Sequence, residues 1–76
     1  MKSLVELMAK SLVDQPEQVV VQETDNDGVV TLELKVAEAD MGKVIGKHGR
    51  IAQSMRTVLK AAAIKENRKV TLEITQ

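Results

Sequence analysis

The chain has 76 residues and a formal net charge of zero, and this length leaves room for one domain with one hydrophobic core. It has no cysteine, which excludes a disulfide framework and a thiolate metal site and indicates a reducing, intracellular compartment. A single histidine cannot form a zinc site alone, so we expect one domain over residues 1–76 with no metal and no cofactor.

The first predicted element is a helix from about Ser3 to Val13. Ser3 and Glu6 have the spacing of a capping box, and Pro16 ends the segment because proline disfavours a helical residue before it. Acidic residues interrupt the apolar stretch, so it is neither a signal peptide nor a membrane span, and we expect a soluble cytoplasmic protein with no membrane partner. The predicted apolar face of this helix consists of Leu4, Leu7, Met8 and Leu12.

Two strands follow. The β-branched run Val19–Val21 predicts one strand, and the alternation of apolar and polar residues over Val30–Val36 predicts another. The cluster Thr24–Gly28 between them is typical of a turn. The two strands should therefore form an antiparallel hairpin.

The second half of the chain predicts two helices and a strand. Asp40 is a candidate N-cap for a short helix that ends near Ile45, and a longer helix runs from about Arg50 to Ile64 before Glu66-Asn67 breaks it. Val70–Thr75 alternates as a half-buried strand. The predicted apolar face of the longer helix consists of Ile51, Met55, Val58, Leu59 and Ala62. The order α-β-β-α-α-β predicts an α+β fold in which three helices cover one face of a three-stranded sheet.

Charge is unevenly distributed despite the net value of zero. Between Asp14 and Asp40 the chain has eight acidic residues and one lysine, a local balance of −7, whereas between Met41 and Lys69 it has eight basic residues and one glutamate, a balance of +7. Such asymmetry favours a C-terminal half that faces a polyanion. An ordinary solvated surface whose charges happen to be sorted is the alternative that the counts leave open.

The segment IGKHGR, residues 45–50, places a flexible cationic loop between the two predicted helices. Gly46 and Gly49 lack Cβ atoms, so the chain can turn sharply and bring its backbone close to another backbone. Lys47, His48 and Arg50 add donors and charge beside the N-terminus of the following helix, a favourable place for phosphate, and Lys43 lies one turn upstream. A tight turn between two helices would need the glycines but not the cationic pair.

The segment MGKVIGKHGRIAQSMRTVL resembles the core of the KH RNA-binding domain, whose signature is V-I-G-x-x-G followed by a basic residue and an amphipathic helix. With two strands before the motif and one after it, the chain is similar to the type II, prokaryotic arrangement. The resemblance spans essentially the whole chain. It implies that Gly46, Lys47, His48 and Gly49 grip the sugar-phosphate backbone of single-stranded RNA. It further implies a nucleotide groove with Val44, Ile45 and Ile51 on one side and the strand around Leu32–Val36 on the other.

The resemblance also implies partners and a cellular role. The chain has no Phe, Tyr or Trp, so base stacking on aromatic side chains is impossible and one copy should bind RNA weakly. Small bacterial single-KH proteins are associated with self-pairing and with a larger KH-containing partner of the KhpB (EloR/Jag) type. The resemblance therefore implies a homodimer or such a heteromer, acting in post-transcriptional regulation or RNA chaperoning.

Two other classes of function compete with RNA binding. An enzyme is rejected, because the one histidine lies in a flexible loop and GKVIGKHG lacks the Gly-Lys-Ser/Thr ending of a nucleotide-hydrolysing P-loop. A protein-docking or oligomerisation module, in which RNA binding is secondary, stays open as the alternative.

Overall fold

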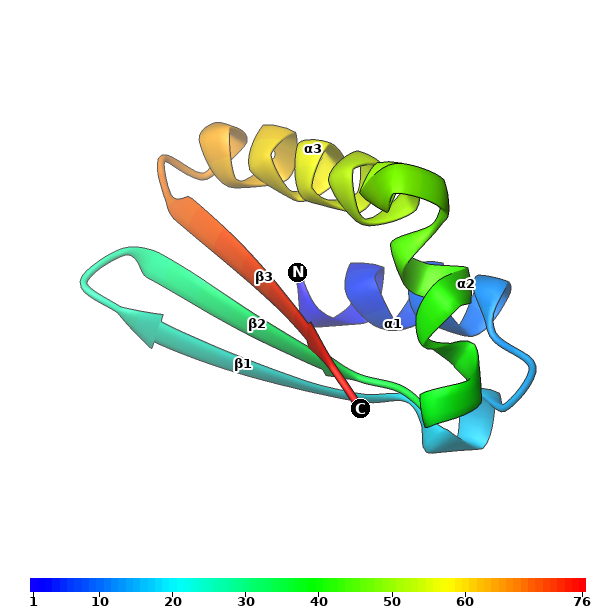
Figure 1. Cartoon of the computed structure of the whole chain (residues 1–76). Coiled ribbons are helices and arrows are strands. Elements are labelled where there is room, and N and C mark those ends of the chain that lie inside the picture. Colours follow the sequence, from blue (N-terminus) through cyan, green and yellow to red (C-terminus); the bar gives the residue numbers. More distant parts are fainter.

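The computed structural model describes residues 1–76 and contains a three-stranded sheet with three helices in the order α-β-β-α-α-β (Figure 1). The predicted α+β fold is therefore confirmed. The helices are α1 (Lys2–Leu12), α2 (Met41–Ile45) and α3 (Arg50–Lys65), and the strands are β1 (Val20–Asn26), β2 (Val29–Lys35) and β3 (Lys69–Thr75). Short 3₁₀ turns lie at Pro16–Gln18, Glu38–Asp40 and Lys47–Gly49. None of the helices is both long and apolar enough to cross a membrane.

β2 is the central strand of the sheet. It pairs antiparallel with β1, as predicted, but the turn is only Asp27–Gly28, since β1 continues to Asn26. Both turn residues have positive φ, which is the requirement of a tight two-residue hairpin turn. β3 pairs with β2 in parallel, because the chain crosses the sheet through α2 and α3 before it returns.

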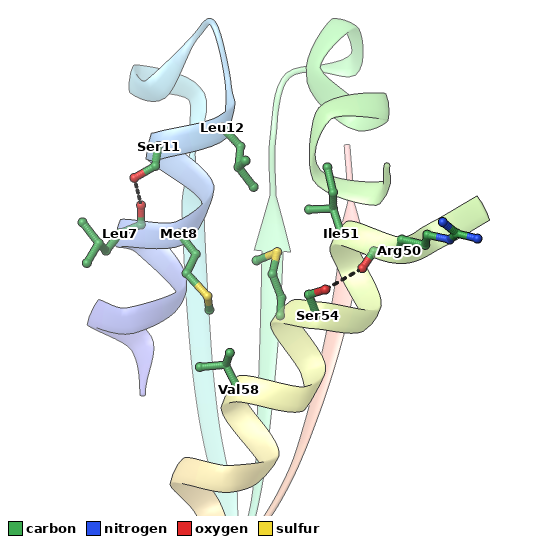
Figure 2. Close-up of a pocket in the computed structure, with 9 residues that line it drawn as sticks. Leu7, Met8, Ser11, Leu12, Arg50, Ile51, Ser54 and Val58 are labelled. Atoms are coloured by element: carbon green, nitrogen blue, oxygen red, sulfur yellow. Dashed lines mark hydrogen bonds between the residues drawn. The ribbon is translucent and has the colours of Figure 1, made fainter. Parts of the chain in front are cut away.

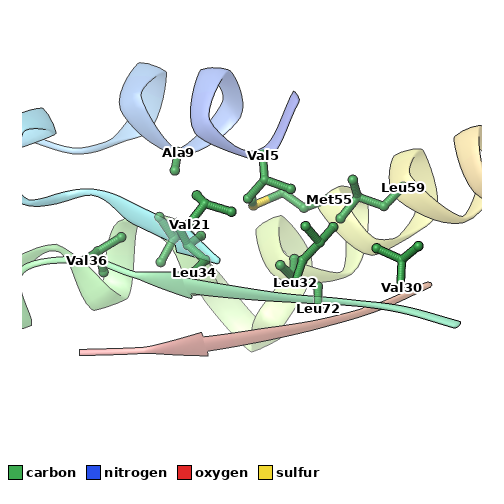
Figure 3. Close-up of a cluster of buried hydrophobic side chains, with 11 residues drawn as sticks. Val5, Ala9, Val21, Val30, Leu32, Leu34, Val36, Met55, Leu59 and Leu72 are labelled. Atoms are coloured by element: carbon green, nitrogen blue, oxygen red, sulfur yellow. The ribbon is translucent and has the colours of Figure 1, made fainter. Parts of the chain in front are cut away.

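The helices form one layer over one face of the sheet (Figure 1). α1 packs along β1, α3 packs along β3, and α2 closes the end of the layer by packing against both helices. Figure 3 shows the core between the layers. Its buried side chains are Val5, Ala9, Val21, Val30, Leu32, Leu34, Val36, Val44, Met55, Leu59 and Leu72.

The structure corrects which apolar residues of the two long helices face this core. On α1 the fully buried residues are Val5 and Ala9, whereas Leu7 is 66% exposed and Leu12 is also exposed. On α3 the buried residues are Ala52, Met55, Leu59 and Ala63, and Val58 is 46% exposed. Each helix therefore carries a second apolar stripe outside the core, which helical periodicity alone could not separate from the first.

The helix ends also differ from the predictions. α1 begins at Lys2, and no side chain caps its N-terminus, so the predicted capping box of Ser3 and Glu6 does not form. α3 ends at Lys65 with Asn67 in the left-handed conformation, where the amide of Arg68 donates to the carbonyl of Ala63 at 2.8 Å. This geometry is a Schellman motif, so the predicted break at Glu66-Asn67 is confirmed.

Asp40 holds the connection after α1 against the start of α2. It stands at the N-cap position of α2, but its carboxylate makes no capping hydrogen bond. Its two oxygens instead accept hydrogen bonds from the backbone amides of Asp14, at 3.2 Å, and Gln15, at 3.0 Å. Lys43 completes the cluster: its ammonium lies 3.5 Å from Asp40 and is also paired with Asp14. Asp40 is the one buried charged residue, and these hydrogen bonds and the ion pair offset the cost of burying its charge.

Asp40 should make stability depend on pH. Burial opposes its ionisation, but the amides of Asp14 and Gln15 and the charge of Lys43 outweigh that effect and hold the pKa of Asp40 below its ordinary value of 3.8. Its contribution to stability is therefore complete above about pH 5 and is lost as the pH falls through the folded-state pKa. The Asp14 partner raises the pKa of Lys43 above 10.5, so that contribution is complete at lower pH and lost only as the pH rises through the raised value.

We expect Asp40→Asn to lower the melting temperature by roughly 5 °C or more at pH 7, because both amides lose a charged acceptor, one of them faces an NH₂ group instead of an oxygen, and Lys43 loses a partner. Melting curves from pH 3 to pH 7 check this. The difference between wild type and variant should shrink towards pH 3. Glu38→Gln, an exposed carboxylate of the same turn, is the control and should change little. A variant difference that is constant over this pH range would contradict the account.

Candidate nucleic-acid interface

The loop between α2 and α3 is a tight turn in which three of four residues have positive φ. Gly46 has φ 78° and ψ 174°, His48 has φ 58° and ψ 25°, and Gly49 has φ 72° and ψ 15°. The conformation of Gly46 belongs to a region that only glycine adopts readily, whereas those of His48 and Gly49 are left-handed helical and open to other residues at some cost. The two glycines of G-x-x-G therefore have different requirements.

Gly46 is also confined by packing. A Cβ atom built on Gly46 would lie 2.5 Å from Cγ1 of Ile51, well inside any van der Waals contact. A Cβ atom on Gly49 would meet nothing within 4 Å. The side chain of Ile51, in the first turn of α3, thus fills the space directly beside the loop backbone.

The loop presents positive charge and backbone donors together. Lys47, His48 and Arg50 are all exposed, and none of them forms an ion pair within the chain. No side chain caps the N-terminus of α3, whose N-cap is Gly49. The positive end of a 16-residue helix is therefore open to an external anion beside three cationic or hydrogen-bonding side chains.

Lys43 has intramolecular partners that the sequence did not predict. Its ammonium is paired with Asp14 and Asp40 rather than left free beside the loop. A phosphate would have to compete with two carboxylates for it. Lys43 therefore links α2 to the segment after α1, whereas the cations that follow Gly46 have no ion pair, and contact of Lys43 with RNA stays a prediction.

Ion pairing also reduces the predicted separation of charge between the halves of the chain. Lys43 joins Asp14 and Asp40, and Arg68 lies 2.8 Å from Asp25, so two of the eight basic residues are matched by acidic residues of the first half. Exposed cations without an ion pair are found at Lys47, Arg50, Arg56, Lys60, Lys65 and Lys69. The residual positive charge of α3 begins at the loop and follows the helix.

The predicted walls of the nucleotide groove are wrong in two respects. Val44 is fully buried, so it supports the loop from within the core and cannot line a surface groove. Leu32 and Leu34 of the central strand β2, and Val36 just after it, are likewise buried, because their side chains lie beneath the helices. Ile45 and Ile51 are partly exposed beside the loop, as a contact surface requires.

β3 is the strand that lies beside the loop-bearing helix. α3 packs along it, and Arg56 donates a hydrogen bond from Nη2 to the carbonyl oxygen of Leu72 at 3.2 Å. This contact joins the exposed side of α3 to the backbone of an edge strand. The pattern of apolar residues in the sequence could not reveal this contact, because the contact depends on β3 pairing in parallel with β2 and so lying beside α3.

A groove lies on the opposite side of α3, between that helix and α1 (Figure 2). Its volume is about 560 Å³, and Met8, Leu12, Ile51 and Val58 are directed into it, while Leu7 and Arg50 project outward at its margins. Ser11, Ser54 and Met55 complete the lining, and both hydroxyl groups donate to carbonyls of their own helices. This groove is formed by the second apolar stripes of α1 and α3. The sequence pattern assigned most of these residues to the core.

No group of three or more His, Cys, Asp or Glu side chains is arranged to hold a metal ion. The single histidine, His48, is exposed in the loop and has no acidic partner.

Comparisons with known proteins identify the family. The family model described as the KH domain of KhpA/KhpB matches residues 2–74. The chain is 65% identical over 74 residues to the RNA-binding protein KhpA of Clostridium perfringens, covering 97% of this chain and 99% of that protein. It is 47% identical to the RNA-binding protein KhpA of Aquifex aeolicus, covering 100% of this chain and 96% of that protein.

Solved structures agree with the fold. The chain is similar to part of the Era protein of Aquifex aeolicus, with a TM-score of 0.66 and 21% identity over 97% of this chain. A second Era structure, solved with a nucleotide and a segment of 16S ribosomal RNA, gives a TM-score of 0.61 at 22% identity. The chain covers only 29% and 28% of those Era chains, so the likeness concerns a single domain of each.

The geometry predicts that the two loop glycines differ in their tolerance of a methyl group. Gly46→Ala should lower the free energy of unfolding by about 2–5 kcal/mol, because it combines a disfavoured backbone conformation with a clash against Ile51. Gly49→Ala, the matched control, should lower it by only about 1 kcal/mol, since its methyl group enters open space. Urea unfolding of both variants measures the difference. Equal losses would show that Ile51 does not confine Gly46.

Proposed function

The chain belongs to the KhpA/KhpB KH-domain family, and we propose that it binds single-stranded RNA through the GKHG loop. The family is one of non-enzymatic KH-domain proteins. The observation that carries the proposal is the junction of an uncapped helix N-terminus with an exposed turn at Lys47 and His48.

The loop suits a phosphodiester backbone for reasons of charge and of shape. A phosphate at the start of α3 would meet the positive end of the helix together with the ammonium of Lys47 and the imidazole of His48. Gly46 and Gly49 carry no side chains, so a nucleotide backbone can approach the loop closely. These contacts fix the position of RNA without reading its sequence.

Bases would lie beside the loop, between the start of α3 and the edge of the sheet. Ile45 is the partly exposed aliphatic contact on α2, and β3 replaces β2 as the neighbouring strand. Arg56 bonds Leu72 through one guanidinium nitrogen, which leaves further N–H donors for a base or phosphate. Without aromatic side chains, the bases gain only aliphatic contact and hydrogen bonds, so one copy should bind weakly and with loose sequence preference.

Weak binding by one copy favours a two-site assembly. The groove between α1 and α3 exposes leucine, isoleucine, methionine and valine side chains, and the projecting Leu7 lies next to the recess. In a twofold pair of identical chains, the projecting Leu7 of each chain can pack into the groove of the other. We therefore assign this face to a homodimer, with a larger KH-containing protein of the KhpB type as the heterologous alternative. Two linked sites raise the effective RNA concentration without new contacts to RNA.

Post-transcriptional regulation or RNA chaperoning in the cytoplasm is the role that such a dimeric RNA-binding module would serve. A protein-docking module with secondary RNA binding is the second candidate function. The observation that favours it is the same groove, since its lining is apolar and Arg50 is its single charged residue. The two functions differ in their dependence on the loop cations.

We expect Lys47→Asp with His48→Asp to weaken binding of a short unstructured RNA at least about tenfold, because two carboxylates would face the phosphates. Fluorescence anisotropy at several salt concentrations measures this, and wild type should show a linear fall of log affinity with log salt. Both side chains are exposed, so circular dichroism should show that the variant folds.

The control is Lys10→Asp, which changes the net charge by as much as Lys47→Asp does and places the carboxylate at an exposed site on α1, outside the loop. It should leave RNA affinity within about twofold of wild type at physiological salt. RNA binding that survives the loop substitutions would contradict the proposal that the GKHG loop binds phosphate. An equal loss of RNA affinity in the Lys10 variant would contradict it as well. Self-association with no RNA binding would leave the docking module as the function.

A further inference from the structure

Arg56 occupies the free edge of the sheet beside the loop-bearing helix. β3 is an edge strand, and Nη2 of Arg56 donates a hydrogen bond to the carbonyl oxygen of Leu72 at 3.2 Å. We propose that Arg56 is a specificity-determining residue, which makes this edge select guanine over adenine at one nucleotide of the bound RNA. The proposal rests on the proposed function and names the base that the same site prefers.

The backbone groups of β3 point alternately towards β2 and towards the free edge. Lys69 and Thr75, the first and last residues of the strand, both form backbone hydrogen bonds to the residues that flank β2. In a parallel pair, the N–H and C=O groups of one residue point to the same side, and the side alternates along the strand. Backbone groups therefore point to the free edge at Val70, Leu72 and Ile74.

Arg56 changes the hydrogen-bonding character of this edge. A bare edge offers a base both kinds of partner, because each outward residue has an N–H donor and a C=O acceptor. At Leu72 the acceptor is already bonded to a guanidinium, which has five N–H donors and no acceptor. A base amino group that approached this carbonyl would meet other donors and a positive charge. The edge at Leu72 thus presents donors: its own amide and the remaining N–H groups of Arg56.

The guanidinium of Arg56 is available to a ligand. No ion pair within the chain includes Arg56, and the residue is exposed. Its hydrogen bond to Leu72 holds one nitrogen of the planar group in place. Arg56 follows Arg50 by six residues on α3, which at 1.5 Å per residue is about 9 Å along the helix axis from the loop. An RNA of four nucleotides held at the loop can therefore reach it.

A pair of donors favours guanine. Guanine has two adjacent acceptors, N7 and O6, and an arginine can donate to both. Adenine also has N7 as an acceptor, but it has the N6 amino group where guanine has O6. That amino group would face the N–H groups of Arg56. Because a single arginine is bonded to this edge, we expect the preference at one nucleotide only.

The experiment measures the affinity of tetranucleotides in which guanosine or adenosine replaces one uridine of UUUU, at each position in turn. Fluorescence anisotropy compares wild type with Arg56→Met at low salt, where RNA binding is strongest. Methionine keeps a flexible, unbranched side chain but has no donor, so it frees the carbonyl of Leu72. The control is Lys60→Met, which removes the same charge from an exposed side chain one helical turn along α3.

We expect wild type to bind the guanosine RNA at least about fivefold more tightly than the adenosine RNA at one of the four positions. In Arg56→Met this ratio should fall to about one or below, because the freed carbonyl of Leu72 can accept from N6 of adenine. Lys60→Met should weaken both RNAs by the same factor, since it removes only a general attraction to phosphate. Melting curves verify that each variant is folded.

A second variant tests the same point if Arg56→Met does not fold. Arg56→Lys keeps the positive charge and a donor for Leu72 but lacks the planar pair of donors. Its preference for guanosine should therefore be weaker than that of wild type, whereas its affinity for UUUU should stay within about twofold.

Several results would overturn the role of Arg56. One is equal affinity of wild type for the guanosine and adenosine RNAs at every position, and another is a guanosine preference that persists unchanged in Arg56→Met or Arg56→Lys. A uniform loss in Arg56→Met, like that in Lys60→Met, would make Arg56 a phosphate contact instead. In each of these cases wild type still binds RNA, so the proposed function stands. A wild type that binds none of the RNAs would overturn the proposed function and the base preference with it.

Discussion

The buried carboxylate of Asp40 is the interaction on which the helical layer depends. It accepts hydrogen bonds from two consecutive amides after α1 and lies beside Lys43 on α2. α1 packs along β1 and α3 along β3, at opposite sides of the layer, and the sheet and the apolar core join them from below. Asp40 connects the two sides through α2. α2 in turn packs against both α1 and α3, and the loop follows directly from its last residue.

The loop illustrates how one glycine can serve structure and recognition together. Gly46 adopts a conformation that other residues avoid, and Ile51 fills the space where a side chain would be. The backbone is therefore exposed to solvent on one side and tightly packed on the other. Such a loop is well suited to phosphate, because its amides and the start of α3 are held in place before any ligand arrives. Gly49 also has a left-handed conformation, but no atom fills the space beside its Cα where a side chain would be.

The two long helices divide their apolar residues between a core and a surface. Val5, Ala9 and the matching residues of α3 fill the space over the sheet, whereas Leu12, Ile51 and Val58 line the groove. Charge is divided in a similar way. Lys43 and Arg68 neutralise carboxylates of the first half of the chain, and the cations of the loop and of α3 remain free. The tertiary neighbours of an apolar residue thus decide whether it packs in the core or lines the groove, and those of a cation decide whether it is paired or free.

The sequence by itself determined the order of the elements, the antiparallel hairpin and the glycine loop, because these depend on local periodicity, turn residues and backbone freedom. It also carried the family signature over nearly the whole chain. It could not show that Val44 is buried, that Lys43 is paired, or that β3 rather than β2 lies beside the loop. Nor could it separate the core stripes of α1 and α3 from the groove. Only the tertiary structure decided these points, because each depends on contacts between residues far apart in the chain, and a one-dimensional pattern of apolar and charged residues does not record which partner each will meet.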